Sequence, residues 1–132
     1  MTKVLLISPQ ENYPKKAETY PAGALLVLGS ILDKEGIDVK CIHMVSDNIG
    51  LGELENEIRA YLPTIVGVTM NTFQTKYSKQ IFKLVKTIDS NIVTVAGGPH
   101  PSALKLEMFK DFEGLDIVVY GEGENSFLDI VK

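Results

Sequence analysis

The chain has 132 residues and a formal net charge of −4, from 13 basic and 17 acidic side chains. That length fits one domain, which can bury a core without a disulfide or a structural metal. Cys41 is the single cysteine, so the chain alone can form neither an internal disulfide nor a cysteine-bound iron–sulfur cluster. There is no basic stripe, and the apolar runs are too short to span a bilayer, so we expect neither nucleic acid nor a membrane as a partner. The low cysteine content is typical of the reducing cytoplasm, where we expect the protein to reside.

Strand patterns and helix patterns alternate five times along the chain. Residues 3–8 form an apolar run that ends before Pro9, which is typical of a strand buried on both faces of a sheet. Residues 37–43 alternate between apolar and polar side chains, which indicates a strand nearer the edge. The expected strands are residues 3–8, 37–43, 65–69, 92–96 and 115–120. The expected helices are residues 22–35, 53–62, 74–89, 102–109 and 124–132, and the inward side chains of the second and third are Leu54, Ile58, Tyr61, Leu62, Tyr77, Ile81, Leu84, Val85 and Ile88.

This alternation predicts right-handed crossovers and a parallel sheet with helices on both faces. We therefore predict an α/β fold, a three-layer Rossmann-like domain of the flavodoxin type, with five parallel strands in the order 2-1-3-4-5. Residues 9–20 form a long polar connection, and long loops in compact domains are often functional. The last helix pattern is still apolar where the sequence stops, so we expect residues 1–132 to be one domain of a longer protein.

Three loops that leave the carboxyl ends of the expected strands consist of glycine and small polar residues. They are Thr69, Met70, Asn71 and Thr72 after the third strand, Gly97, Gly98, Pro99 and His100 after the fourth, and Gly121, Glu122 and Gly123 after the fifth. These three strands are neighbours in the predicted order, and open parallel sheets bind ligands beyond their carboxyl ends. Exposed backbone and little bulk predict a trough for a large, flat or elongated ligand. Alternatively, the glycines form ordinary tight turns and the threonines ordinary helix caps.

The titratable residues near these loops each allow two interpretations. His100 lies between two prolines and is either a metal or cofactor ligand or a histidine that stabilises its own loop. We favour the second, because no carboxylate or cysteine partner accompanies it. Glu122 and Glu124 are either an acid–base pair or carboxylates that stabilise a helix start through its dipole. His43, at the end of the second strand, is expected to pack or cap.

Five segments of the chain carry a resemblance to a known family. They are residues 97–103 (GGPHPSA), 118–127 (VVYGEGENSF), 3–9 (KVLLISP), 20–25 (YPAGAL) and 65–69 (IVGVT). Together they resemble the N-terminal cobalamin-binding domain of the cobalamin-dependent radical S-adenosylmethionine (SAM) enzymes. The resemblance covers essentially the whole chain and implies the same Rossmann-like fold, with cobalamin as the cofactor.

The resemblance also implies where the cofactor would lie. The third loop would meet the nucleotide tail of cobalamin, Gly97 and Gly98 would let the tail lie along the end of the fourth strand, and the last loop would line the far wall. The residues implied in cofactor binding are Thr69, Met70, Asn71, Thr72, Gly97, Gly98, Pro99, His100, Gly121, Glu122 and Gly123. No residue is assigned a catalytic or metal-binding role.

Two motifs of related enzymes are missing from this sequence. Cobalamin-dependent mutases and methionine synthase carry Asp-x-His-x-x-Gly in the first loop, whose histidine ligates cobalt, but residues 9–20 contain no histidine. The resemblance therefore implies base-off cobalamin without a histidine lower ligand, which suits a cobalt(I) nucleophile that takes a methyl group from SAM. The Cys-x3-Cys-x2-Cys run that binds a 4Fe-4S cluster is also missing. We expect this chain to bind cobalamin without catalysis. The parent would add a downstream radical SAM domain, with the cluster and SAM, and act as a methyltransferase or a cyclase.

Other ligand classes fit this sequence less well. A phospho-acceptor receiver needs acidic residues at the ends of the first and third strands, where this chain has Ser8 and Thr69. A flavin binder needs a serine- and threonine-rich loop after the first strand, and residues 9–12 do not form one. A ligand-free, flavodoxin-like interaction or signalling domain remains the alternative.

Overall fold

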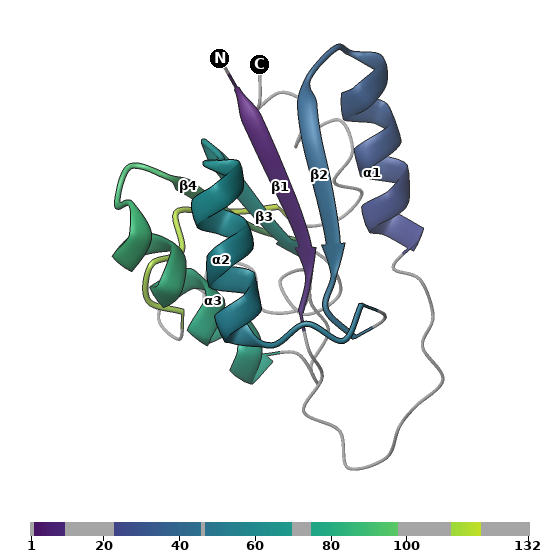
Figure 1. Cartoon of the computed structure of the whole chain (residues 1–132). Helices are drawn as coiled ribbons and strands as arrows, with labels where there is room; N and C mark the ends of the chain where they lie inside the picture. Colours follow the sequence, from purple (N-terminus) through teal and green to yellow (C-terminus); the bar gives the residue numbers. More distant parts are fainter. Residues whose placement is uncertain (1, 10–22, 46, 70–74, 98–111, 120–132) are drawn as a thin grey trace.

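Five parallel strands form the central sheet, in the order β2-β1-β3-β4-β5 (Figure 1). They are β1 (Lys3–Ser8), β2 (Asp38–His43), β3 (Ile65–Thr69), β4 (Val93–Gly97) and β5 (Ile117–Val118). The computed structural model describes residues 2–9, 23–45, 47–69, 75–97 and 112–119, with the backbone alone for residues 23–27. The α/β class, the parallel sheet and the strand order agree with the prediction.

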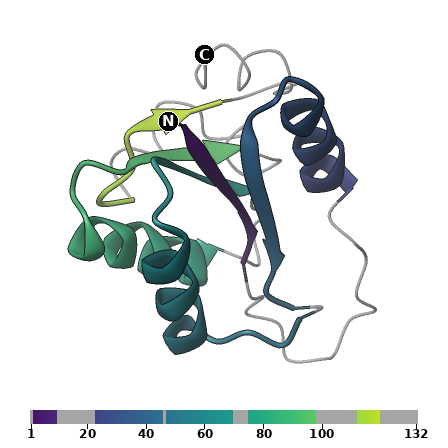
Figure 2. The same ribbon diagram turned by 45° about the horizontal axis from the view of Figure 1, so that its top comes forward.

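Helices cover both faces of the sheet and complete three layers. Figures 1 and 2 show α1 (Gly23–Lys34) on one face beside β2, and α2 (Leu51–Tyr61) and α3 (Thr75–Ile88) on the other. The helices predicted at residues 102–109 and 124–132 lie outside the described residues.

Each face of the sheet packs into its own hydrophobic core. Leu5 and Ile7 of β1 belong to the core under α2 and α3, whereas Val4 and Leu6 belong to the core under α1. Successive residues of a strand point to opposite faces, and all four side chains are at most 1% exposed. β1 is therefore buried on both faces, as predicted, and it anchors the two cores to each other.

The second helix differs from the prediction at both ends. Gly50 is its N-cap in an extended conformation, so α2 begins at Leu51, two residues before the predicted start at Glu53. Leu62 is the C-cap, with a φ of 54°, and its N–H donates to the carbonyl of Ile58. This left-handed conformation turns the side chain outward, and Leu62 is 67% exposed. The prediction that Leu62 faces the core is wrong.

α3 contributes a buried aromatic residue that the sequence pattern did not single out. Phe82 is fully buried, and its ring meets Phe112 edge-on with the ring centroids 6.0 Å apart. Ile81 and Val85 are buried as predicted, whereas Tyr77 is only half-buried. The face of α3 that packs on the sheet is therefore rotated toward Phe82, compared with the face that the sequence pattern predicted.

β5 has two residues where the sequence predicted a strand over residues 115–120. Just before it, the backbone N–H of Asp116 donates to Thr94 Oγ1 at 3.0 Å. The Asp116 carboxylate accepts from the Thr94 N–H at 3.0 Å and from Lys86 Nζ at 2.5 Å. Partial burial opposes ionisation, but these bonds hold the pKa of Asp116 below its usual value. The Asp116 N–H also donates to the Thr94 carbonyl at 3.2 Å, so the side-chain bonds add to the backbone bond where β5 approaches β4.

Candidate functional site

The carboxyl ends of the strands form one row of residues on the face that α1 covers. This edge row consists of His43 on β2, Ser8 on β1, Thr69 on β3, Gly97 on β4 and Val119 just after β5. Ser8 is paired with His43, and Thr69 with Gly97. Ile7 pairs with Val68 and Ala96 with Val118, so the next residues along these strands, Ser8 and Thr69 and likewise Gly97 and Val119, lie side by side. The chain therefore leaves β3, β4 and β5 at neighbouring positions, as the site prediction requires.

Two further rows lie behind the edge row on the same face. The middle row is Cys41, Leu6, Gly67, Val95 and Ile117, and the inner row is Val39, Val4, Ile65 and Val93. The rows are about 6.6 Å apart, because a parallel strand rises about 3.3 Å per residue. Gly67, Thr69 and Gly97 leave little side-chain bulk on this face of β3 and β4.

Gly97 leaves open space at the edge row. A Cβ on this glycine would meet, among the described atoms, only the carbonyl oxygen of Val119, at 3.9 Å. Gly97 does not have a left-handed φ, so the backbone does not require a glycine there. The hydroxyl-bearing Thr69 lies directly opposite, and Ser8 is next along the row and buried. Bare backbone with hydroxyl groups beside it fits an elongated, partly polar ligand that enters from this edge.

α1 approaches the sheet closely where it passes β2. A Cβ on Gly29 would lie 2.9 Å from the Sγ atom of Cys41, so the glycine permits this contact. Cys41 is exposed, and partial desolvation against α1 raises the pKa of its thiol. Gly29 therefore helps to set the distance between α1 and the face that carries the three rows.

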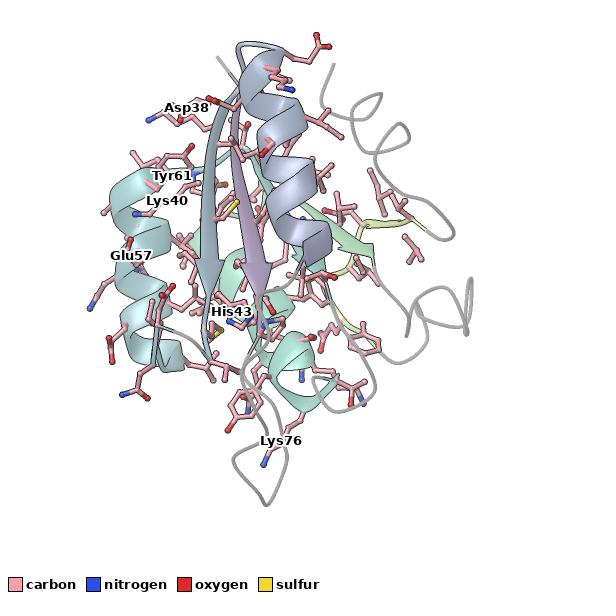
Figure 3. The ribbon with its side chains drawn as sticks, turned by 90° about the vertical axis from the view of Figure 1, so that its right-hand side faces the viewer. Asp38, Lys40, His43, Glu57, Tyr61 and Lys76 are labelled. Atoms are coloured by element: carbon pink, nitrogen blue, oxygen red, sulfur yellow. The ribbon has the colours of Figure 1, made fainter. Side chains whose placement is uncertain are left out.

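Two basic residues lie near the same edge of the sheet. His43 is half-buried, and its backbone N–H donates to Asp47 Oδ2 at 3.3 Å. Figure 3 shows Lys76 beyond the carboxyl ends of β1 and β2, on the first turn of α3, where there is no acidic residue. A lysine and a helix N-terminus both contribute positive potential, so this edge favours an anionic group.

A second group of charged residues lies along β2 and α2, from the amino end of the sheet to its middle. Tyr61 donates to Asp38 Oδ1 at 2.7 Å, and Lys40 and Glu57 form an ion pair at 2.5 Å (Figure 3). Partial burial and the bond to Asp38 raise the pKa of Tyr61. The edge row is at the far end of the strands, so these groups support the α2–β2 packing and do not belong to the candidate site.

The structure describes two of the predicted site residues and places them together. Thr69 and Gly97 are register partners in adjacent strands. Outside the described residues lie Met70, Asn71, Thr72, Gly98, Pro99, His100, Gly121, Glu122 and Gly123. Ser8 and Gly67 share the face with the two described residues, and sequence reasoning missed them. The alternation within β3 puts Gly67 on the same face as Thr69, whereas Ser8 is placed on that face by the register between β1 and β3.

The part of the chain that the structure describes contains neither a cluster of metal-ligating side chains nor a helix that could span a membrane. No group of three or more histidine, cysteine, aspartate or glutamate side chains could hold a metal ion there. None of the helices in these ranges is both long and apolar enough to cross a bilayer.

Comparison with known families identifies the class of this chain. Residues 16–131 match the model of the B12 binding domain. The match covers most of the sequence, so the chain belongs to the B12-binding domain family. The predicted resemblance to cobalamin-binding domains is confirmed at this level.

Two curated relatives belong to longer proteins. An uncharacterized methyltransferase of Pyrococcus horikoshii is 30% identical over 133 residues, which is 99% of this chain and 29% of that protein. The anaerobic magnesium-protoporphyrin IX monomethyl ester cyclase of Rubrivivax gelatinosus is 28% identical over 120 residues, 91% of this chain and 20% of that protein. The chain thus spans less than a third of the length of either relative.

Two solved structures share the fold over the whole chain. The radical SAM methyltransferase TsrM of Kitasatospora setae matches with a TM-score of 0.83 and 22% identity, covering 99% of this chain and 25% of that one. OxsB, a cobalamin-dependent SAM radical enzyme solved with aqua-cobalamin and SAM bound, matches with a TM-score of 0.77 and 22% identity, covering 100% of this chain and 18% of that one. The structural neighbours are therefore cobalamin-dependent radical SAM enzymes, and the likeness establishes the Rossmann-like fold.

Proposed function

We propose that this chain holds cobalamin at the carboxyl edge of its sheet, as the cofactor-binding module of a longer radical SAM enzyme. The observation that carries the proposal is the edge row, in which bare backbone at Gly97 lies beside the hydroxyl groups of Thr69 and Ser8. This row occurs in a chain of the B12-binding family, on the face that α1 flanks.

The described residues would bind and orient the nucleotide tail. The tail would lie against the ends of β3 and β4, where Gly97 carries no side chain. Thr69 would offer a hydroxyl hydrogen bond at the rim, and Lys76 would favour the phosphodiester of the tail through its charge. The predicted contacts of Met70, Asn71, Thr72, Gly98, Pro99, His100, Gly121, Glu122 and Gly123 with the cofactor stay part of this proposal.

The chemistry of the whole protein would depend on the bound cofactor and on a further domain that binds the 4Fe-4S cluster and SAM. Bound cobalamin supplies a cobalt centre able to carry a methyl group, and the parent would be a methyltransferase or a cyclase, as its relatives are named. A tail held against the sheet would not be available to the cobalt, and residues 9–20 would offer no histidine in its place, because they contain none. Residues 1–132 would form one domain that binds the cofactor, and a downstream domain would supply the 4Fe-4S cluster and SAM.

An absorbance titration tests the proposal directly. The purified chain is mixed with hydroxocobalamin and desalted, and we expect it to remain coloured with a shifted corrin spectrum. Electron paramagnetic resonance of the reduced cob(II)alamin complex should lack the splitting that an imidazole or benzimidazole nitrogen causes. A colourless protein at micromolar concentration would instead favour the ligand-free interaction or signalling domain.

A further inference from the structure

The outer edge of β2 is a surface that the proposed function does not use. β2 lies at one end of the strand order, and within the described sheet β1 is its one neighbouring strand. Asp38, Lys40 and Cys41 are exposed, and Figure 3 shows β2 between α1 and α2. A strand at the edge of a sheet offers its outward backbone N–H and C=O groups to another strand.

Alternate residues of β2 direct their backbone groups away from β1. The Met44 N–H donates to the carbonyl of Ser8 on β1 at 2.9 Å, so the even-numbered residues of β2 face β1. Val39, Cys41 and His43 therefore face outward. The N–H and C=O of His43 already bond to the turn that follows β2. Among the described residues, the backbone groups of Val39 and Cys41 are thus the ones that a further strand would meet.

The side chains of this edge differ between the two faces of the sheet. Asp38 and Lys40 share the α2 face, whereas Ile37, Val39 and Cys41 share the α1 face. Charged side chains protect an edge strand against indiscriminate pairing. A strand that pairs with β2 must therefore place a suitable residue opposite each of the two charges.

The order of these charges selects one register for antiparallel pairing of β2 with β2 of a second copy. When Val39 lies opposite Val39 of the second copy, Asp38 of each copy lies opposite Lys40 of the other. The neighbouring registers place either Lys40 opposite Lys40 or Asp38 opposite Asp38, and like charges directly opposite each other are unfavourable. A register centred on Cys41 would require the backbone groups of His43, which are occupied.

We propose that the outer edge of β2 is a self-association surface, on which two copies of this chain pair antiparallel about a two-fold axis at Val39. Val39 N–H would donate to the Val39 carbonyl of the other copy, in both directions. Cys41 N–H would donate to the Ile37 carbonyl of the other copy, whose own N–H is already bonded to the carbonyl of Leu32. On the α1 face, Ile37 and Cys41 would then lie opposite each other beside the central pair of valines.

This pairing joins the two sheets into one and leaves the carboxyl edges accessible. The two central strands run in opposite directions, so the carboxyl edges of the two copies lie at opposite ends of the joined sheet. The inference does not depend on the proposed cofactor, since it involves the outer edge of β2 and not the ends of β3 and β4. Cobalamin binding and self-association should therefore respond to different substitutions.

Charge reversal tests the register. Self-association of the purified chain is measured by analytical ultracentrifugation from micromolar to millimolar concentration, and we expect a dimer. Lys40→Asp and Asp38→Lys each place like charges opposite each other at both symmetry-related positions, so each should raise the dissociation constant of the dimer roughly tenfold or more. The double variant Asp38→Lys/Lys40→Asp restores opposite charges in the same register and should recover most of the affinity of the parent.

Glu57→Gln is the matched control for the charge series. Lys40 also pairs with Glu57 within the chain, and Glu57→Gln removes that ion pair without changing the charges on β2. We expect the dissociation constant of this variant to match that of the parent. A parent that stays monomeric at millimolar concentration would overturn the proposal, as would a double variant that associates no better than either single variant.

Disulfide trapping tests the position of the axis. In a Cys41→Ala background, Val39→Cys places two thiols on the axis, where opposite Cα atoms are about 5.5 Å apart, a distance that a disulfide spans. Cys41 in the parent would lie roughly 13 Å from Cys41 of the second copy, four residues along the strand, which is too far. Thr87→Cys in the same background is the control, because it places an exposed thiol on α3.

Under mild oxidation, Val39→Cys should form the covalent dimer at least tenfold faster than either the parent or Thr87→Cys. Equal rates for Val39→Cys and Thr87→Cys would overturn the pairing, and faster cross-linking of the parent through Cys41 would overturn the register. If Val39→Cys fails to fold, the charge series still decides the proposal. Loss of cobalamin retention in a chain that still dimerises would overturn the proposed function and leave this surface standing.

Discussion

Gly97 offers the sharpest separation between stability and cofactor binding in this chain. Replacing it with leucine adds a side chain to the edge row, on the face where we place the nucleotide tail. The fold should accept the change, because the first added atom would meet, within the described chain, one oxygen at 3.9 Å. Glycine also weakens a strand relative to other residues, so we expect the melting temperature of Gly97→Leu to equal or exceed that of the parent.

Binding should respond in the opposite direction. Filling a well-packed space with extra methylene groups costs about 1–3 kcal/mol. At 1.4 kcal/mol for each factor of ten, the dissociation constant for cobalamin should rise roughly 5- to 150-fold. Gly97→Ala adds a single methyl group at ordinary contact distance and should fall between the parent and the leucine variant.

Gly52→Leu provides the matched control for this experiment. Gly52 lies on α2, on the other face of the sheet, and a Cβ there meets no described atom within 4 Å. Cobalamin affinities and melting temperatures are measured for the parent and all three variants. A folded Gly97→Leu chain with the affinity of the parent would refute the placement of the tail on this face.

Three further predictions concern the elements around the site. In a Cys41→Ala background, Gly29→Ala should raise the free energy of unfolding by about 1 kcal/mol, because alanine favours a helix more than glycine does. In the parent this gain should be lost, because the new Cβ would lie 2.9 Å from the Cys41 sulfur. A double-mutant cycle with urea unfolding measures the coupling energy between the two positions. Asp116→Asn should lower the melting temperature at neutral pH by a few degrees, corresponding to about 1 kcal/mol for a partly exposed ion pair. The pKa of Asp116 is lowered in the folded chain, so its contribution is present above the unfolded pKa of about 3.9 and is lost as the pH falls, and melting curves of the two proteins should converge in acid. Lys76→Glu should weaken cobalamin binding several-fold at low salt, and Lys83→Glu, farther along α3, should weaken it less. Equal losses of cobalamin affinity in the two variants would argue against an anionic group of the cofactor near the first turn of α3.

The central strands could be predicted closely because their signal is local. The apolar runs of β1 and β3 end at Ser8 and Thr69, which are also the observed ends of the strands. β5 begins later than predicted, at Ile117, and Asp116 just before it adds side-chain bonds to Thr94, a long-range contact that no strand pattern contains. The start of α2 was missed for a similar reason, since Gly50 and Gly52 indicate a loop unless the cap geometry is known.

The site was only partly predictable for a different reason. Glycine and threonine at strand ends identified Thr69 and Gly97, and the strand order brought them to one edge. The roles of Gly67 and Ser8 depend on which face of the sheet each strand residue occupies. For Gly67 the alternation within β3 is enough, but for Ser8 the assignment requires the register between β1 and β3, which a sequence read one strand at a time does not contain.

The shortness of β5 has a consequence for motion at this end of the molecule. Within the described residues, β5 pairs with β4 through Val95 and Ala96, and the Val119 N–H and the Asp116 N–H add backbone bonds to the carbonyls of Ala96 and Thr94. Few bonds must break to release this strand, whereas β1 is held along its whole length by two neighbours. Amide hydrogens of residues 117–119 should therefore exchange with solvent well before those of β1, through local opening that leaves the two cores intact. A corrinoid seated beside Gly97 would lie next to the most easily detached strand of the sheet, so loading should slow exchange at residues 117–119 more than elsewhere.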